Sequence, residues 1–353
     1  MLNTCELFND NWLFVKQKTA PDIKMANNIM HSGNALDWKP IYVPHDWLIY
    51  DTNNLYESSV GFYKKEFDIE KNGRLFQVRF DGVYMDSSVY INSAHVGDWK
   101  YGYSTFEFDI TDFLRDGRNE IIVMVVNESP NSRWYSGAGI YRNVWLSTFN
   151  KTHIAPDGVY ITPAKISNGT WEVTVDSEIN AGEENTHVEV RHTIHDPKGN
   201  VVAGCEQGHL NTERIFCDGQ TLKVNTPNLW HIDSDGANIY KLKTEVYRDS
   251  ILTHVEENDF GFRTIEFDPE NGFLLNGKRI KLQGVCQHHD LGALGAAMNV
   301  TALKRQLRLL KEMGANAIRT AHNMPDPLLM DLADRMGFLI VSEAFDMWEL
   351  PKT

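Results

Sequence analysis

Residues 316–343 read NAIRTAHNMPDPLLMDLADRMGFLIVSE, and this stretch decides the fold of its part of the chain. A short apolar strand is expected at 317–319. Asp326-Pro327 then marks the start of a helix, because Asp caps a helix N-terminus and Pro fits the first turn. A buried strand follows at 338–341, just after Gly337. The apolar residues at helical spacing in between are Leu328, Leu332 and Met336. The order strand, helix, strand predicts a parallel β/α unit.

The preceding residues extend this pattern. Asn276-Gly277 predicts a hairpin turn that leads into a strand at 280–284. A helix follows, with Asn299 or Thr301 as its N-cap and Gly314 just past its end. Its inward-facing residues are Leu303, Leu307 and Leu310. Two β/α units and a third strand are typical of a βα-barrel or a doubly wound sheet. No glycine-rich phosphate loop follows the strands, which disfavours a dinucleotide-binding fold. A complete barrel has eight units, so only its first part is expected here.

Upstream, the first 150 residues show many short strand patterns and no amphipathic helix. Apolar and polar residues alternate at 76–80, as in a half-buried strand. The run at 121–126 is apolar on both faces and predicts a central strand. A short turn is expected at 111–114. This spacing predicts a β-sandwich of the jelly-roll type.

A second all-β region follows. Strand patterns at 171–176, 188–194 and 240–247 alternate, and 196–200 (DPKGN) predicts a turn. An immunoglobulin-like β-sandwich fits this length and spacing. We therefore expect a mostly β multidomain chain, with the domains 1–150, 151–266 and 267–353.

The composition excludes some partners. The chain has 34 basic and 48 acidic residues, a net charge of −14, which argues against nucleic acid and anionic membranes. We see neither a secretion signal at the start nor an apolar run long enough to span a membrane. The four cysteines lack zinc-site spacing and disulfide density, so a cytoplasmic location is expected. Nine tryptophans and thirteen tyrosines can either form sandwich cores or stack on sugars.

Polar side chains gather where the three predicted parallel strands end. The clusters are 286–290 (CQHHD), 319–323 (RTAHN) and 342–348 (SEAFDMW). Active sites of βα-barrels lie at this rim. Adjacent residues at a strand end point to opposite sides, so His288-His289 does not predict a metal site. Arg319 is expected either to bind substrate or to form an ion pair with Glu343. Cys286 is expected to be a packed thiol.

Several stretches resemble glycoside hydrolase family 2, which contains β-galactosidases, β-glucuronidases and β-mannosidases. They are 44–47 (PHDW), 134–146 (WYSGAGIYRNVWL), 226–230 (TPNLW), 260–263 (FGFR), 276–290 and 316–343. The resemblance implies a sugar-binding jelly-roll, an immunoglobulin-like domain and a catalytic barrel. It also implies that His288 contacts substrate and that Arg319 and His322 shape the site.

The chain departs from this family in two respects. An acidic loop residue that usually points at the sugar is replaced by Asn131-Ser132-Arg133. The acid/base and nucleophile glutamates that the family implies would lie beyond Thr353. The resemblance thus implies no catalytic residue within the chain, which should not turn over substrate by itself.

The expected function is the N-terminal portion of a retaining exo-β-glycosidase acting on terminal β-D-galactosides. The alternatives are a β-glucuronidase and a non-catalytic carbohydrate-binding protein. No metal or other cofactor is expected, and a homo-oligomer is possible. The expected substrate-binding residues are His288, His289, Asp290, Arg319, His322, Asn323, Glu343, Asp346 and Trp348.

Overall fold

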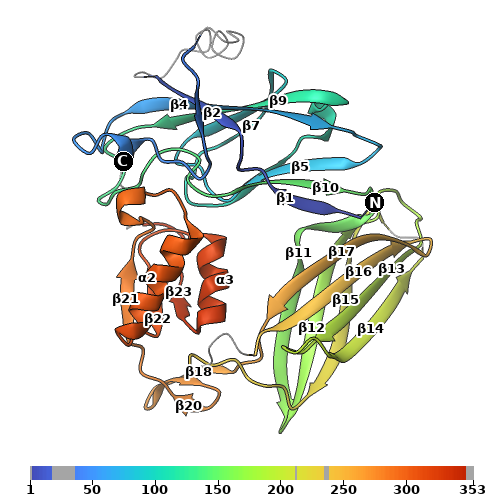
Figure 1. Cartoon of the computed structure of the whole chain (residues 1–353). Coiled ribbons are helices and arrows are strands. Elements are labelled where there is room, and N and C mark those ends of the chain that lie inside the picture. The colour runs from blue at the N-terminus through green and yellow to red at the C-terminus, as the bar shows by residue number, and fades with distance from the viewer. Residues whose placement is uncertain (1, 18–35, 211–212, 234–237, 347–353) are drawn as a thin grey trace.

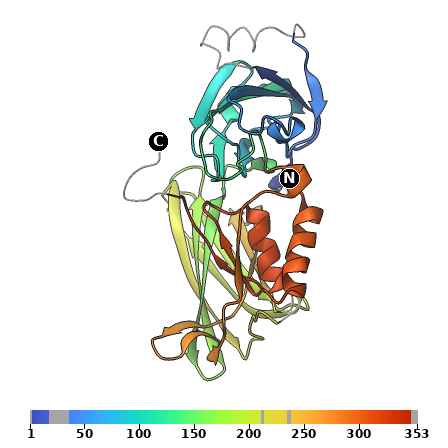
Figure 2. The same ribbon diagram turned by 90° about the vertical axis from the view of Figure 1, so that its left-hand side faces the viewer.

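The computed structural model describes residues 2–17, 36–210, 213–233 and 238–346. Two β-sandwiches and a small β/α segment pack together, with the β/α segment below the first sandwich and beside the second (Figures 1 and 2). No helix among the described residues is long and apolar enough to cross a membrane.

The N-terminal sandwich consists of two antiparallel sheets, as expected for a jelly-roll. The six-stranded sheet has the order β3 (Lys39–Ile41), β2 (Trp12–Gln17), β4 (Ser59–Ile69), β9 (Gly117–Asn127), β6 (Ser87–Ile91), β7 (Ala94–Trp99). The four-stranded sheet has the order β1 (Thr4–Leu7), β10 (Val144–Phe149), β5 (Leu75–Phe80), β8 (Phe106–Asp109). The prediction of a central strand at 121–126 is confirmed by β9, which pairs with β4 and β6.

The helical segments in the described part of this sandwich are two short 3-10 turns. They are η2 (Leu48–Tyr50) and η3 (Thr111–Phe113), the second at the predicted turn. Trp12, Trp47 and Tyr63 are buried between the sheets. The structural interpretation of the aromatic residues is therefore confirmed for these three.

The second sandwich also has two antiparallel sheets. One has the order β11 (His153–Ser167), β12 (Thr170–Asn180), β15 (Ile215–Asn225). The other has the order β14 (Val201–His209), β13 (Val188–His195), β16 (Tyr240–Arg248), β17 (Ile251–Phe260). Each strand pattern predicted here lies inside one of these strands. Trp171, Leu242 and Phe262 fill the core between the sheets.

The third part begins with a small sheet and continues as β/α units. β18 (Ile265–Asp268), β19 (Gly272–Leu275) and β20 (Lys278–Arg279) form the small sheet, and positive φ at Asn276 and Gly277 confirms the predicted hairpin turn. A parallel sheet follows, with β21 (Gly284–Gln287), β22 (Ala317–Thr320) and β23 (Leu339–Val341) in that order.

The first parallel strand is displaced from its predicted position at 280–284. Its pairing with β22 starts at Gly284 and Ala317. Before that point, the Asn316 amide still donates to the Gln283 carbonyl, and the Asn316 side chain accepts from the Gln283 amide and donates to the Lys281 carbonyl. Side-chain hydrogen bonds of this kind cannot be recognised in the pattern of apolar residues.

Two helices cover one face of the parallel sheet. α2 (Val300–Glu312) is capped by the Asn299 side chain, so the alternative cap Thr301 is wrong. α3 (Pro327–Met336) starts at the predicted cap Asp326 and ends at Gly337 with φ +70°. A Cβ on Gly337 would lie 2.5 Å from the Ile232 carbonyl oxygen, so only glycine permits this approach to the second sandwich.

Candidate active site

The carboxyl ends of the three parallel strands form one rim that faces the jelly-roll. Cys286, Arg319 and Val341 lie in register on β21, β22 and β23. The three predicted clusters are thus brought to the same edge. Cys286 is exposed rather than packed, because α2 and α3 cover only the other face of this sheet.

Arg319, His322 and Glu343 form a hydrogen-bonded group on the rim. Arg319 Nε donates to one Glu343 oxygen, and His322 Nδ1 lies 2.7 Å from the other. Burial raises the pKa of Glu343, but the hydrogen bonds from His322 and Arg319 outweigh it and leave the pKa below its ordinary value. The expected Arg319–Glu343 ion pair is confirmed. The ionised, paired Glu343 is unsuited to act as a general acid.

His288 and His289 have different ring partners in the jelly-roll. The His288 ring stacks on the Trp134 indole, with centroids 5.2 Å apart and planes at 15°. His322 meets the same indole edge-on at 5.7 Å. Trp134 comes from a jelly-roll loop, so this loop reaches the rim and holds both histidines in place.

His289 lies against the jelly-roll instead of the cleft. Its Nε2 is 2.9 Å from the Ser136 carbonyl oxygen, and its ring packs on Tyr103 and Tyr141. Burial lowers the pKa of His289 to about 4, so the ring is neutral near pH 7. In this structure the residue therefore holds the first rim loop to the jelly-roll.

The remaining predicted site residues are spread around the rim. Asn323 is buried, and its Nδ2 has no hydrogen-bond partner among the described residues. Burial raises the pKa of Tyr135, and the nearby Asp46 and Asp290 carboxylates raise it further. Asp290 therefore lies close to Tyr135. Asp346 lines a cleft between the jelly-roll loops and the rim. Trp348 is outside the described residues.

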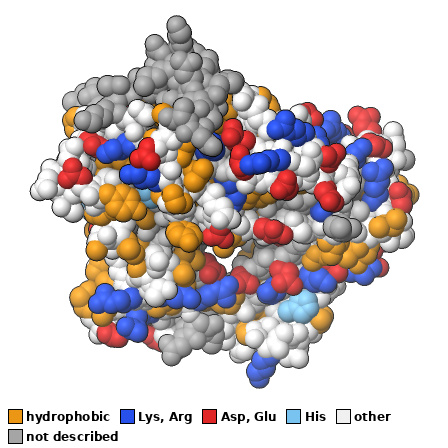
Figure 3. Space-filling view, turned by 45° about the horizontal axis from the view of Figure 1, so that its top comes forward, with side chains coloured by type: hydrophobic (Ala, Val, Ile, Leu, Met, Phe, Trp, Pro, Cys, Tyr) orange, Lys and Arg blue, Asp and Glu red, His pale blue; other side chains and the backbone are white. Residues whose placement is uncertain are grey.

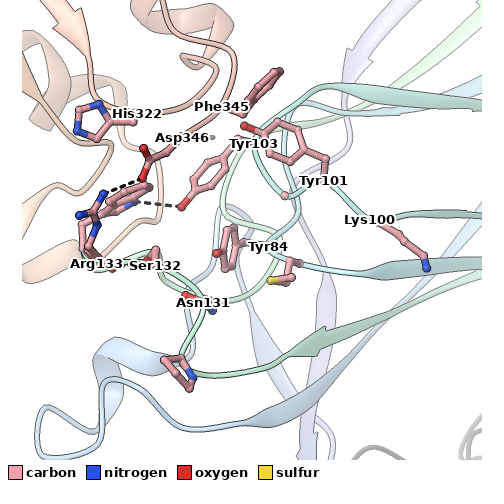
Figure 4. A pocket seen from close by; sticks show the side chains of 14 residues that line it. Tyr84, Lys100, Tyr101, Tyr103, Asn131, Ser132, Arg133, His322, Phe345 and Asp346 are labelled. Atoms are coloured by element: carbon pink, nitrogen blue, oxygen red, sulfur yellow. Dashed lines mark hydrogen bonds and ion pairs between the residues drawn. The ribbon is translucent and has the colours of Figure 1, made fainter. Parts of the chain in front are cut away.

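A cleft of about 760 Å³ separates the jelly-roll loops from the rim (Figure 4). Its jelly-roll wall includes Tyr101 and Tyr103, and its rim wall includes His322 and Phe345. The volume falls within the range of small-molecule sites. On the face shown in Figure 3, acidic and basic side chains are interspersed and form no single charged patch.

Two bonds bridge the cleft between the domains. Arg133 Nη2 lies 3.6 Å from Asp346 Oδ2, and the Tyr101 hydroxyl donates to the Ala344 carbonyl (Figure 4 shows the first). The jelly-roll thus supplies a cation where an acidic residue was expected from the resemblance. The carboxylate at this point of the cleft comes from the rim.

Two buried charged residues that were not predicted also join the jelly-roll to the rim. Asp46 accepts from the Ala296 amide at 2.9 Å and from the Tyr135 hydroxyl at 2.5 Å. Arg142 donates to the Met324 carbonyl at 2.8 Å, and its Nε lies 3.5 Å from Asp326. Both lie inside stretches that carried the family resemblance, which was the available signal.

Solved structures with the same arrangement are glycoside hydrolases. A family 2 member from Bacteroides cellulosilyticus superposes with a TM-score of 0.89 at 36% identity, over 99% of this chain and 47% of that one. The fold and the rim-facing cleft therefore place the chain among the multidomain glycoside hydrolases.

Three family models then match in succession. They are "Glycosyl hydrolases family 2, sugar binding domain" at 5–150, "Glycosyl hydrolases family 2" at 152–263 and "Glycosyl hydrolases family 2, TIM barrel domain" at 268–347. The chain belongs to glycoside hydrolase family 2.

Curated relatives carry two different activities in their names. The β-galactosidase BoGH2A of Bacteroides ovatus is 41% identical over 90% of this chain. A β-glucuronidase of Formosa agariphila is 29% identical over 94% of it. The chain spans 39% and 37% of the lengths of these two proteins. The relatives thus define a family of β-glycosidases without separating the two sugars.

Proposed function

We propose that this chain supplies the sugar-binding domains and the first rim loops of a retaining exo-β-glycosidase acting on terminal β-D-galactosides. The observation that carries the proposal is the group around His322, which lines one end of a 760 Å³ cleft and contacts Glu343, Arg319 and His288 on the rim. Donors and acceptors gathered at the end of a concave, largely apolar site suit a sugar ring.

The proposal includes the domain division 1–150, 151–266 and 267–353. It also includes the predicted set of substrate-binding residues, in which His289 acts by holding the first rim loop. The similarity to BoGH2A favours galactoside over other sugars.

A β-glucuronidase is the second candidate. The relatives named as β-glucuronidases favour it, and so do the cations Lys100 and Arg133 at the cleft. A carboxylate-bearing sugar needs a cationic partner of this kind.

Retaining hydrolysis needs two carboxyl groups about 5–5.5 Å apart, one of them protonated. Two of the described rim carboxylates, Glu343 and Asp346, each face a cation, Arg319 and Arg133 respectively. Neither is arranged as a general acid. We therefore propose that catalysis requires glutamates outside this chain.

A panel of aryl β-glycosides tests the proposed function. A longer form of the protein that carries a complete barrel should hydrolyse the β-D-galactoside with the highest kcat/KM. The 353-residue chain should show no hydrolysis above the uncatalysed rate. Preference for the β-D-glucuronide would replace the first candidate by the second, and turnover by the repurified chain would contradict the proposed division of labour.

A further inference from the structure

The cleft changes in chemistry along its length. At the rim end His322 lines the cleft, and Arg319 and Glu343 lie beside it as its polar partners. Toward the jelly-roll the lining becomes aromatic, with Tyr101 37% exposed and Phe345 62% exposed. Figure 4 shows these two rings close together at one end of the cleft and His322 at the other. A ligand that fills the cleft therefore contacts polar groups at one end and aromatic rings at the other.

The aromatic wall is held rigidly by the jelly-roll. The buried Tyr103 ring lies 5.0 Å from Tyr84 and 5.8 Å from Tyr101. Trp134 Nε1 donates to the Tyr103 hydroxyl at 3.2 Å. A Cβ on Gly102 would lie 2.4 Å from the Tyr84 ring, so a larger residue between the two tyrosines would disturb the wall. Such a wall loses little conformational freedom when a ligand binds.

We propose that Tyr101 and Phe345 form the leaving-group subsite of this cleft and bind a flat ring with an apolar face. This inference rests on the proposed function, since the ring is joined by the β-glycosidic oxygen to the sugar held at the rim end. Two leaving groups share this chemistry, an aryl aglycone and a second sugar ring. Both can place an apolar face on an aromatic side chain.

Each residue of the subsite comes from a different domain. Tyr101 follows β7 of the jelly-roll, and Phe345 follows β23 of the parallel sheet. The Tyr101 hydroxyl donates to the Ala344 carbonyl, which fixes the loop next to Phe345. The Tyr101 ring and the Tyr101 hydroxyl therefore have separate roles, and substitution can separate them.

Equilibrium binding to the 353-residue chain tests the inference without turnover. Affinities of methyl β-D-galactoside, 4-nitrophenyl β-D-galactoside and lactose are measured by calorimetry, and the methyl and aryl pair is repeated as β-D-glucuronides. We expect a ring-bearing ligand to bind about fivefold more tightly than its methyl counterpart, as expected for one or two ring contacts. A gain confined to the aryl glycoside assigns the wall to aryl aglycones, and a gain confined to lactose assigns it to oligosaccharides.

Variants connect this gain to the two rings. The double variant with Tyr101→Ala and Phe345→Ala should bind ring-bearing and methyl glycosides with about equal affinity. Its affinity for the methyl glycoside should be unchanged. Tyr101→Phe keeps the ring and should keep the gain. Tyr42→Ala, which removes an exposed tyrosine outside the cleft, should have no effect.

The outcomes separate this inference from the proposed function. Equal affinities for methyl and ring-bearing ligands in both series would overturn the inference. A gain in affinity that survives the double variant would do so too, and so would the absence of binding by every probe. Failure of the proposed function appears differently. In that case neither methyl glycoside binds, while free 4-nitrophenol still binds and loses affinity in the double variant.

Discussion

At the residue scale, Trp134 links the two candidate sugar-contacting histidines. It stacks on His288 and meets His322 edge-on, so the rings of the rim are oriented by a side chain from another domain. The Arg319–Glu343 pair could be predicted from the sequence, because both residues end neighbouring parallel strands. The Trp134–His288 stack could not, because no local pattern encodes which loop of one domain reaches the rim of another.

The first prediction separates the polar and stacking roles of His288. In a form of the protein with a complete barrel, His288→Ala should lower kcat by roughly 10–1000-fold, about 1.4–4 kcal/mol, if its nitrogen binds a sugar hydroxyl in the transition state. His288→Phe keeps a ring on Trp134 but lacks the nitrogens, so kcat should fall by a similar factor. Steady-state kinetics of both variants, with melting curves as the folding control, decide this. Normal kcat in the Phe variant would assign His288 to packing alone.

At the element scale, the β/α units and the ends of their helices were predictable, but the start of the first parallel strand was not. Helix ends are marked by Asn299, Asp326 and Gly337, whose cap roles depend on neighbours in the chain. The start of β21 depends on the Asn316 side chain from the adjacent strand, a contact that periodicity does not show. Similarly, His289 was expected to bind substrate, but its loop packs on the jelly-roll.

The second prediction concerns the loop that carries His322. Arg142 is buried and holds this loop through the Met324 carbonyl and Asp326. Arg142→Met leaves Asp326 buried without its cation, which typically costs about 3–5 kcal/mol. We expect hydrogen exchange in 320–326 to speed up, and Arg142→Lys, which keeps the charge, to recover part of the protection.

Arg79→Met is the matched control. Arg79 joins the jelly-roll to the second sandwich through Asp157, and its other partner, Asp81, lies in the jelly-roll. This variant should leave exchange in 320–326 unchanged. An equal effect of both variants would show that loosening of the domains, rather than the Arg142 contacts, controls the loop.

A third prediction follows from the uneven cover of the parallel sheet. α2 and α3 bury Ile318 on one face, whereas Arg319 and Cys286 are exposed on the other. Strands with one open face should exchange faster than strands inside a sandwich, such as β12. Peptide-resolved hydrogen exchange of the 353-residue chain should therefore show β21 and β23 as less protected. Equal protection of β21 and β12 would contradict this expectation.

At the scale of the whole molecule, buried neutral histidines lie in both sandwiches. Burial lowers the pKa of His45 to about 4 in the jelly-roll and that of His254 to about 3 in the second sandwich. His45 Nδ1 is 2.8 Å from the Tyr63 hydroxyl, and His254 Nδ1 accepts from the Ile154 amide. Each ring is thus hydrogen-bonded inside a core as a neutral group. Because it gains a proton more readily in the unfolded chain, its titration changes the stability of the fold.

The last prediction is that acid destabilises the chain from about pH 6.5 downward. The unfolded histidines titrate near 6.5, well above the folded values, so between these values the unfolded chain binds more protons and stability falls as the pH falls. Each histidine should cost on the order of 1 kcal/mol by pH 5.5 and about 3 kcal/mol by pH 4. Burial raises the pKa of Asp326 and Glu256, so these two carboxyls oppose the trend as the pH falls further, and melting temperatures are compared between pH 7.5 and 5.5. His254→Gln should flatten this slope, whereas His95→Gln, at an exposed position, should not. A melting temperature that stays constant over this range would show that these histidines do not gain protons on unfolding.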